Sequence, residues 1–302
     1  MAIQKIPDKA KLEKIGKELV GSPCGPCDMA MNFAHDGARA AANTGGLSVL
    51  SQGSGPDLVL LHGWGMNGLV WEGLPTALTT GRRLWRIELP GHGASPFEPR
   101  HDGRAAWADA CLEAAPERAV WIGWSLGGLL ALEAALRAPE RVRALVLLTA
   151  TPRFVRAPDW PAAMDAEVLA RFHDDLLADP AGTLQRFLAL QVMGSEAARD
   201  TLRTLRRELA QRPAPVPAAL ALGLDLLQTS DLRERIGALT CPTLWLFGQR
   251  DTLVPAAAST GIARLLPQAR CRVLAGAAHA PLLSHPEATG GAIARFLQEI
   301  TC

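Results

Sequence analysis

The clearest indication of the fold comes from residues Ala119-Val120-Trp121-Ile122-Gly123-Trp124-Ser125-Leu126-Gly127-Gly128. Its first four residues are apolar and predict a buried strand, and the apolar pattern over residues 129–137 predicts a helix. Between them stands a match to the pattern G-x-S-x-G, whose glycines permit a turn from strand to helix so sharp that the serine hydroxyl projects outward. We interpret Ser125 as a nucleophile, although a serine that merely caps the helix would also fit the pattern.

On both sides of this turn, short apolar runs alternate with helical patterns. The alternation predicts an α/β fold with a mostly parallel sheet, covered by helices on both faces. Over residues 153–235 the residue pattern is helical and contains few runs typical of strands. This predicts a helical lid inserted into a core of residues 47–152 and 236–302. The predicted strands are residues 58–61, 84–89, 119–123, 144–148, 244–247 and 270–275.

A serine nucleophile needs a histidine base, and the histidine needs a carboxylate that fixes its tautomer. In this architecture the chain order is serine, acid, histidine. The apolar run 243–247 ends in a turn with Asp251, and the run 270–275 is followed by His279. We therefore predict Asp251 as the orienting acid and His279 as the general base. Weaker alternatives are Asp225 and Asp231 for the acid and His285 for the base.

The negative charge that develops on the attacked carbonyl oxygen requires two hydrogen-bond donors. One expected donor is the backbone N–H of Leu126, the residue after the nucleophile. The second is expected in the loop after the strand 58–61, where the N–H of Trp64 follows His62 and Gly63. We interpret His62 as a residue that holds this loop by hydrogen bonds.

The overall charge limits the classes of partner. With 31 basic and 30 acidic residues the formal net charge is +1, which argues against a general nucleic-acid-binding protein. No apolar stretch approaches the about 18 residues that cross a bilayer, and no secretory signal is visible. Six cysteines in 302 residues are too few for a disulfide scaffold, so we expect a cytoplasmic protein. The proposed chemistry needs no metal and no cofactor.

Residues 1–46 differ from the rest of the chain. All lysines lie within the first 17 residues, and an Ala- and Gly-rich run follows. We predict an N-terminal extension, with a flexible linker as the simplest form. Cys24 and Cys27 form a C-x-x-C pattern, but no thioredoxin-like strand and helix surround it, and only His35 could add a zinc ligand nearby. Two free thiols are the simplest interpretation.

These residues resemble the α/β-hydrolase superfamily and, within it, the BioH family of pimeloyl-ACP methyl ester carboxylesterases of bacterial biotin synthesis. The resemblance covers the chain from about residue 47 to its end. It rests on the serine turn and on His62-Gly63-Trp64-Gly65-Met66-Asn67 with Val70-Trp71, Arg186-Phe187-Leu188-Ala189-Leu190-Gln191 with Met193-Gly194, and His279-Ala280-Pro281 with Ser284-His285-Pro286.

The resemblance implies a serine esterase that removes the methyl group from a pimeloyl chain carried on acyl carrier protein. It further implies that Trp64 and Phe187 line the acyl site. Four lid arginines would face the acidic carrier: Arg186, Arg199, Arg203 and Arg207. The sequence itself supports a basic lid, because residues 186–212 hold six arginines against three acids. We expect a monomer.

Two other classes of function remain open. The same triad serves a broad-specificity short-chain carboxylesterase or a carbon–carbon bond hydrolase, which only substrate profiling separates. A non-catalytic binding protein of this fold would usually have lost a member of the triad.

Overall fold

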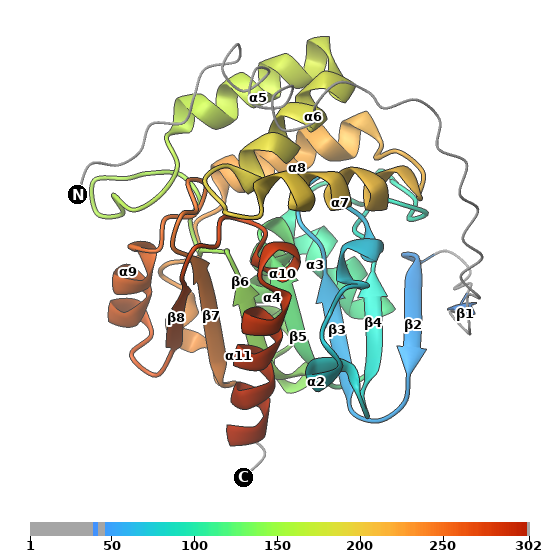
Figure 1. Cartoon of the computed structure of the whole chain (residues 1–302), viewed down its shortest axis with the longest axis vertical. Helices are drawn as coiled ribbons and strands as arrows, with labels where there is room; N and C mark the ends of the chain where they lie inside the picture. The colour runs from blue at the N-terminus through green and yellow to red at the C-terminus, as the bar shows by residue number, and fades with distance from the viewer. Residues whose placement is uncertain (1–38, 42–45, 301–302) are drawn as a thin grey trace.

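The computed structural model describes residues 39–41 and 46–300, which contain one eight-stranded sheet (Figure 1). The strands lie in the order β1-β2-β4-β3-β5-β6-β7-β8. From β4 to β8 neighbouring strands are parallel, whereas β1 and β2 run antiparallel to their neighbours. Their bounds are β1 Arg39–Ala41, β2 Val49–Gly53, β3 Asp57–Leu61, β4 Arg83–Ile87, β5 Ala119–Trp124, β6 Val142–Leu148, β7 Thr243–Gly248 and β8 Arg270–Leu274.

Helices cover both faces of the sheet, as the alternation of patterns predicts. The short α2 (Thr76–Thr79) and the C-terminal α11 (Pro286–Glu299) pack together on one face, and α3 (Arg104–Ala114) and α4 (Leu126–Arg137) pack together on the other (Figure 1). Every residue of β5 is buried, as expected for a central strand covered on both faces. The remaining short elements are η1 Gly68–Trp71, η2 Pro139–Arg141, η3 Ile236–Ala238, α9 Ala258–Leu265 and α10 Pro281–Ser284.

Four helices between β6 and β7 form a layer over one edge of the sheet, at the top of Figure 1. They are α5 (Ala166–Ala178), α6 (Pro180–Val192), α7 (Ala198–Ala210) and α8 (Pro217–Thr229). In α7 the apolar side is buried through Leu202 and Leu205, while Arg203 and Arg207 on its other side are exposed. The helix lies with its apolar stripe against the core, which is the usual arrangement of an amphipathic helix.

The α/β architecture and all six predicted strands are confirmed, each to within two residues at either end. Two strands were not predicted. The strand β2 mixes apolar and polar residues in five positions, and β1 is only three residues long, so neither has an apolar run to reveal it. Of the predicted extension 1–46, all except Arg39–Ala41 and Gly46 lies outside the described residues, including Cys24 and Cys27.

Candidate active site

Ser125 lies at the sharp turn between β5 and α4. Its backbone has φ 55° and ψ −116°, a strained conformation for a residue with a side chain. The turn requires glycine two residues before and two residues after Ser125. A Cβ at residue 123 would overlap the carbonyl oxygen of Gly127, and one at residue 127 would overlap that of Leu61. The Ser125 N–H donates to the carbonyl of Leu148 in β6 at 3.0 Å, which ties the turn to the sheet.

Three side chains from three loops form one hydrogen-bonded chain with Ser125 at its end. The Oγ of Ser125 is 2.9 Å from Nε2 of His279, and Nδ1 of the same ring is 2.8 Å from Oδ2 of Asp251. All three residues are buried. The other carboxylate oxygen, Oδ1, accepts the backbone N–H groups of Leu253 and Val254 at 2.8 and 3.0 Å. The carboxylate is therefore held with one oxygen turned toward the imidazole.

The backbone of His279 is fixed by two side chains that the sequence analysis did not identify. Its carbonyl accepts the indole N–H of Trp124 and the hydroxyl of Thr149, each at 2.8 Å. Trp124 ends β5 and Thr149 follows β6, so the ends of two central strands position the loop of His279. In the sequence, Thr149 could have been noticed as a polar residue directly after a central strand. In the structure its φ of 42° is also unusual.

The two predicted oxyanion donors are available. Within the described residues, neither the N–H of Trp64 nor that of Leu126 donates to any acceptor. The indole of Trp64 is anchored separately, because its Nε1–H donates to the carbonyl of Leu220 in α8 at 2.8 Å. Phe187 of α6 packs edge-on against the Trp64 ring, with 4.7 Å between the centroids. The two aromatic residues that the resemblance places in the acyl site therefore contact one another.

His62 holds the loop that carries Trp64, as the sequence analysis expected. Its Nδ1 lies 2.9 Å from the carbonyl of Gly63, and its Nε2 accepts the N–H of Leu89 at 3.0 Å. Burial lowers the pKa of His62 to about 4, so the ring is neutral near pH 7.

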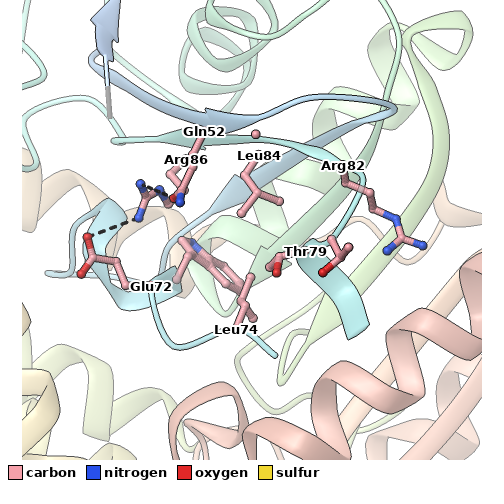
Figure 2. Close-up of a pocket in the computed structure, with 10 residues that line it drawn as sticks. Gln52, Glu72, Leu74, Thr79, Arg82, Leu84 and Arg86 are labelled. Carbon is pink, nitrogen blue, oxygen red and sulfur yellow. Dashed lines mark hydrogen bonds and ion pairs between the residues drawn. The ribbon is translucent and has the colours of Figure 1, made fainter. Parts of the chain in front are cut away.

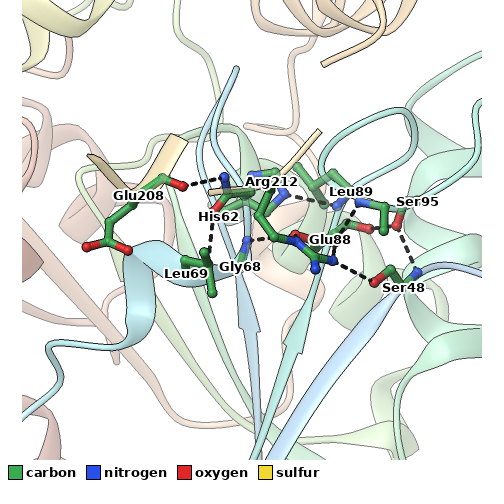
Figure 3. A network of polar contacts seen from close by, with 11 residues as sticks. Ser48, His62, Gly68, Leu69, Glu88, Leu89, Ser95, Glu208 and Arg212 are labelled. Atoms are coloured by element: carbon green, nitrogen blue, oxygen red, sulfur yellow. Dashed lines mark hydrogen bonds and ion pairs between the residues drawn. The ribbon is translucent and has the colours of Figure 1, made fainter. Parts of the chain in front are cut away.

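Helix α7, which lies within the predicted lid, is attached to the core near both ends. Before it begins, the carbonyl of Gly194 and the carboxylate of Glu196 both accept from Arg250, the neighbour of the acid Asp251. At its other end, the carbonyl of Glu208 accepts from the amide of Asn67 at 3.0 Å. Beyond that end lies Arg212, whose contacts with the core are drawn in Figure 3.

Arg212 binds the fully buried carboxylate of Glu88, which follows β4, and its Nη2 also lies 3.3 Å from Oγ of Ser48 (Figure 3). Burial alone would raise the pKa of Glu88, but the hydrogen bonds from Arg212 and from the N–H of Ala94 outweigh it and lower that pKa. The buried Glu88 carboxyl is therefore charged at neutral pH.

The four lid arginines lie in different environments. Arg186 is buried between α5 and α6, where it contacts Thr183 at 2.7 Å and Asp175 at 3.2 Å. The other three lie on the exposed side of α7. Arg203 is 75% exposed and pairs with Asp200, Arg207 is 65% exposed and pairs with Glu208, and Arg199 is exposed. The structure therefore brings Arg199, Arg203 and Arg207 together and separates Arg186 from them.

Several cavities lie away from the triad, and two of them border helices α6 and α8 or the strands β2 and β4. One, of about 650 Å³, lies in the lid and is lined mainly by apolar residues between the start of α6 and the start of α8, among them Leu184 and Leu220. The other, of about 180 Å³, lies beside β2 and β4 and includes Glu72 and Arg86, which form an ion pair at 3.4 Å (Figure 2). None of the predicted site residues lines either cavity.

In the described part of the chain, no three His, Cys, Asp or Glu side chains are grouped so that they could hold a metal ion. Nor does that part contain a helix both long and apolar enough to span a membrane.

The chain resembles known proteins both in sequence and in fold. Residues 56–286 match the family model of the alpha/beta hydrolase fold. A protein of Xanthomonas axonopodis pv. citri, named pimeloyl-[acyl-carrier protein] methyl ester esterase, is 46% identical over 251 residues, which are 82% of this chain and 97% of that protein. A protein of the same name from Aeromonas hydrophila is 45% identical over 242 residues, 80% of this chain and 95% of that one.

Solved structures show the same fold. An esterase from Exiguobacterium antarcticum superposes with a TM-score of 0.74 at 19% identity and covers 85% of this chain and 97% of its own. A hydrolase from Pseudomonas aeruginosa superposes with a TM-score of 0.72 at 25% identity, covering 88% of this chain and 99% of its own. The chain therefore belongs to the alpha/beta hydrolase fold family and is a relative of the pimeloyl-[acyl-carrier protein] methyl ester esterases.

Proposed function

We propose that this protein is a serine carboxylesterase that hydrolyses the methyl ester of pimeloyl-ACP, giving pimeloyl-ACP and methanol in biotin biosynthesis. The observation that carries the proposal is the hydrogen-bonded chain Ser125–His279–Asp251, with contacts of 2.9 and 2.8 Å. The substrate is suggested by the names of the relatives at 45–47% identity over at least 80% of this chain.

The proposed reaction runs in two halves. His279 takes the proton of Ser125 as the serine oxygen attacks the ester carbonyl, and Asp251 stabilises the imidazolium that forms. The N–H groups of Trp64 and Leu126 receive the negative charge on the carbonyl oxygen. Methanol leaves with a proton from His279. Water then attacks the acyl-enzyme in the same way and releases the free carboxylate.

The lid over residues 153–235 supplies the substrate contacts in this proposal. Trp64 and Phe187, which pack against one another, form a wall of the acyl site. Arg199, Arg203 and Arg207 on α7 form the docking surface for the acidic carrier protein. We leave Arg186 out of this surface, because a side chain that is 7% exposed and paired with Asp175 has little area left for a partner.

The cell compartment and the oligomeric state belong to the same proposal. Cys111, Cys241 and Cys271 are free thiols, which is compatible with a reducing cytoplasm. We propose a cytoplasmic monomer, and size-exclusion chromatography with light scattering tests the oligomeric state.

The decisive experiment offers the purified protein pimeloyl-ACP methyl ester beside a short p-nitrophenyl ester and compares kcat/KM. We expect the carrier-linked ester to be strongly preferred. A preference for the small ester would replace the proposal by a broad-specificity esterase. Ser125→Ala should lose turnover of both substrates while keeping the wild-type melting temperature, and a folded but fully active variant would refute the mechanism.

A further inference from the structure

Two buried histidines connect the loops that follow β3 and β4. These strands are parallel neighbours, so their loops leave the same edge of the sheet. His62 comes directly after β3 and accepts the N–H of Leu89 from the other loop at 3.0 Å. His92, in the loop after β4, accepts the N–H of Gly65 from the first loop at 3.3 Å. The connection is reciprocal, because each loop supplies one ring and one backbone donor.

The surroundings of the two rings assign their tautomers. In both rings Nε2 accepts a backbone N–H and therefore carries no proton. In both rings Nδ1 lies 2.9 Å from a backbone carbonyl, that of Gly63 for His62 and that of Pro90 for His92, so Nδ1 carries the proton and donates it. Both side chains are fully buried, and their centroids are 5.2 Å apart. Each ring is a neutral connector with one donor and one acceptor in use.

These contacts hold both peptide groups that flank Trp64. The carbonyl of Gly63 and the N–H of Trp64 belong to one planar peptide group, so a hydrogen bond to that carbonyl fixes the direction of the N–H. The next peptide group joins Trp64 to Gly65, whose N–H is held by His92. We propose that His62 and His92 are positioning residues that orient the Trp64 N–H toward the oxyanion of the reaction.

Hydrogen bonding at the Gly63 carbonyl has a second effect. A peptide whose carbonyl accepts a hydrogen bond is polarised and becomes a better N–H donor. His62 therefore both directs and strengthens the donor. The Trp64 N–H itself has no acceptor among the described residues, so this support acts on a group that is left available for the substrate. The inference rests on the proposed ester hydrolysis but not on the identity of the ester.

Asparagine and glutamine can separate the two bonds of each ring. An asparagine amide places its donor near the position of histidine Nδ1, and a glutamine amide places its acceptor near that of Nε2. His62→Asn keeps the bond to Gly63 and loses that to Leu89, whereas His62→Gln does the reverse. The same rule applies to His92: His92→Gln keeps the bond to Gly65, and His92→Asn keeps only that to Pro90. The bond beside Trp64 is therefore kept by His62→Asn and by His92→Gln.

We expect kcat for p-nitrophenyl acetate to depend on whether a variant keeps the hydrogen bond to the peptide group beside Trp64. His62→Asn and His92→Gln should remain close to wild type. His62→Gln and His92→Asn should lose roughly 10- to 100-fold in kcat with little change in KM, because removal of a whole oxyanion donor costs about 10²- to 10³-fold. The affinity for a trifluoromethyl ketone, which forms a tetrahedral oxyanion on the serine, should fall in parallel. Equal kcat values within each pair of folded variants would overturn the proposal.

His101 is the matched control. It is also a buried histidine, and its Nδ1 accepts the N–H of Glu98 at 3.1 Å, but it contacts neither peptide beside Trp64. His101→Asn and His101→Gln should leave kcat unchanged, and a loss equal to that of His62→Gln would mean that only general packing is involved.

A measurement on the wild type covers the case in which variants do not fold. Nitrogen-15 NMR should find both rings protonated at Nδ1 and unprotonated at Nε2, and protonation of Nε2 in either ring would overturn the proposal.

The small ester separates the proposal about the two histidines from the proposal about the substrate. A protein that cleaves it but not pimeloyl-ACP methyl ester contradicts the proposed substrate and leaves the histidine test intact.

Discussion

Arg212, two residues beyond the end of α7, binds the fully buried carboxylate of Glu88 with Nε at 2.9 Å and Nη2 at 2.5 Å. The pair joins the lid to the end of β4, beside the loop that carries His92. A buried ion pair adds little over an apolar pair, but the loss of one partner leaves a buried charge without compensation.

Arg212→Ala should therefore lower the free energy of unfolding by about 3–5 kcal/mol, measured by urea denaturation. Glu88→Gln combined with Arg212→Met should recover most of the loss. As a control, Arg203→Ala removes an exposed pair with Asp200 and should cost less than about 1 kcal/mol. Equal losses for Arg212→Ala and Arg203→Ala would contradict this account.

Asp251→Asn should reduce kcat by about 10⁴-fold with an unchanged melting temperature, because an amide at this position favours the wrong tautomer of His279. The rate should be measured on both the carrier-linked and the small ester. Asp225, on the exposed side of α8, provides the control, since Asp225→Asn removes a similar carboxylate that does not contact the triad. If Asp225→Asn abolished activity and Asp251→Asn did not, the orienting acid would be Asp225 of α8.

Reversal of the charge on α7 should affect only the carrier-linked substrate. Arg199→Glu with Arg203→Glu should lower kcat/KM for pimeloyl-ACP methyl ester by on the order of tenfold or more, and the loss should shrink at high salt. Hydrolysis of p-nitrophenyl acetate should not change. The matched variant is Arg118→Glu with Arg295→Glu, which reverses two exposed arginines outside the lid. If this matched variant loses as much kcat/KM for the carrier-linked ester, the effect comes from the net charge and not from docking.

Glycine 123 should not tolerate a methyl group. Gly123→Ala places a Cβ against the carbonyl of Gly127, so the strand and the helix must separate, and we expect a large loss of soluble protein and of activity. Gly73→Ala meets no atom within 4 Å and should behave as wild type. A folded and active Gly123→Ala variant would show that the turn can relax.

The stability of the fold should fall in mild acid. Burial lowers the pKa of His62 to about 4 and that of His92 to about 3, against 6.5 in an unfolded chain. Below pH 6.5 the unfolded state binds protons that the folded state excludes, so the free energy of unfolding decreases as the pH falls, by up to about 1.4 kcal/mol per pH unit for each histidine.

Urea denaturation at pH 7, 6 and 5 measures this slope. The double variant His62→Asn with His92→Gln lacks both titrating rings and should show a flatter dependence. An identical slope in wild type and variant would assign the acid sensitivity to other groups.

Those parts of the molecule that depend on neighbouring residues could be predicted from the sequence. The strand before Ser125 is an unbroken apolar run, and the serine turn needs glycines only a few residues away. Asp251 and His279 were predicted because each follows a strand end closely. Each of these features can be recognised from about ten consecutive residues.

The features that depend on distant contacts could not be predicted. The burial of Arg186 depends on α5 and α6 packing together so that Asp175 meets its guanidinium. The bond from Gly65 to His92 spans 27 residues and depends on the register of β3 against β4. Nothing in the neighbouring residues distinguishes His92 from an ordinary loop histidine. The position of Thr149 directly after β6 marks it as unusual, but it does not reveal that its hydroxyl reaches the carbonyl of His279.

The attachment of α7 near both of its ends bears on protein engineering. A lid transplanted from a relative must supply partners for Arg250 at one end and for Asn67 and Glu88 at the other. A graft that lacks either set leaves polar groups of the core without their partners. Substitutions confined to the outer side of α7 leave both attachments in place. That side is therefore the simplest place in which to vary the proposed docking surface without disturbing the loops of Asp251 and Trp64.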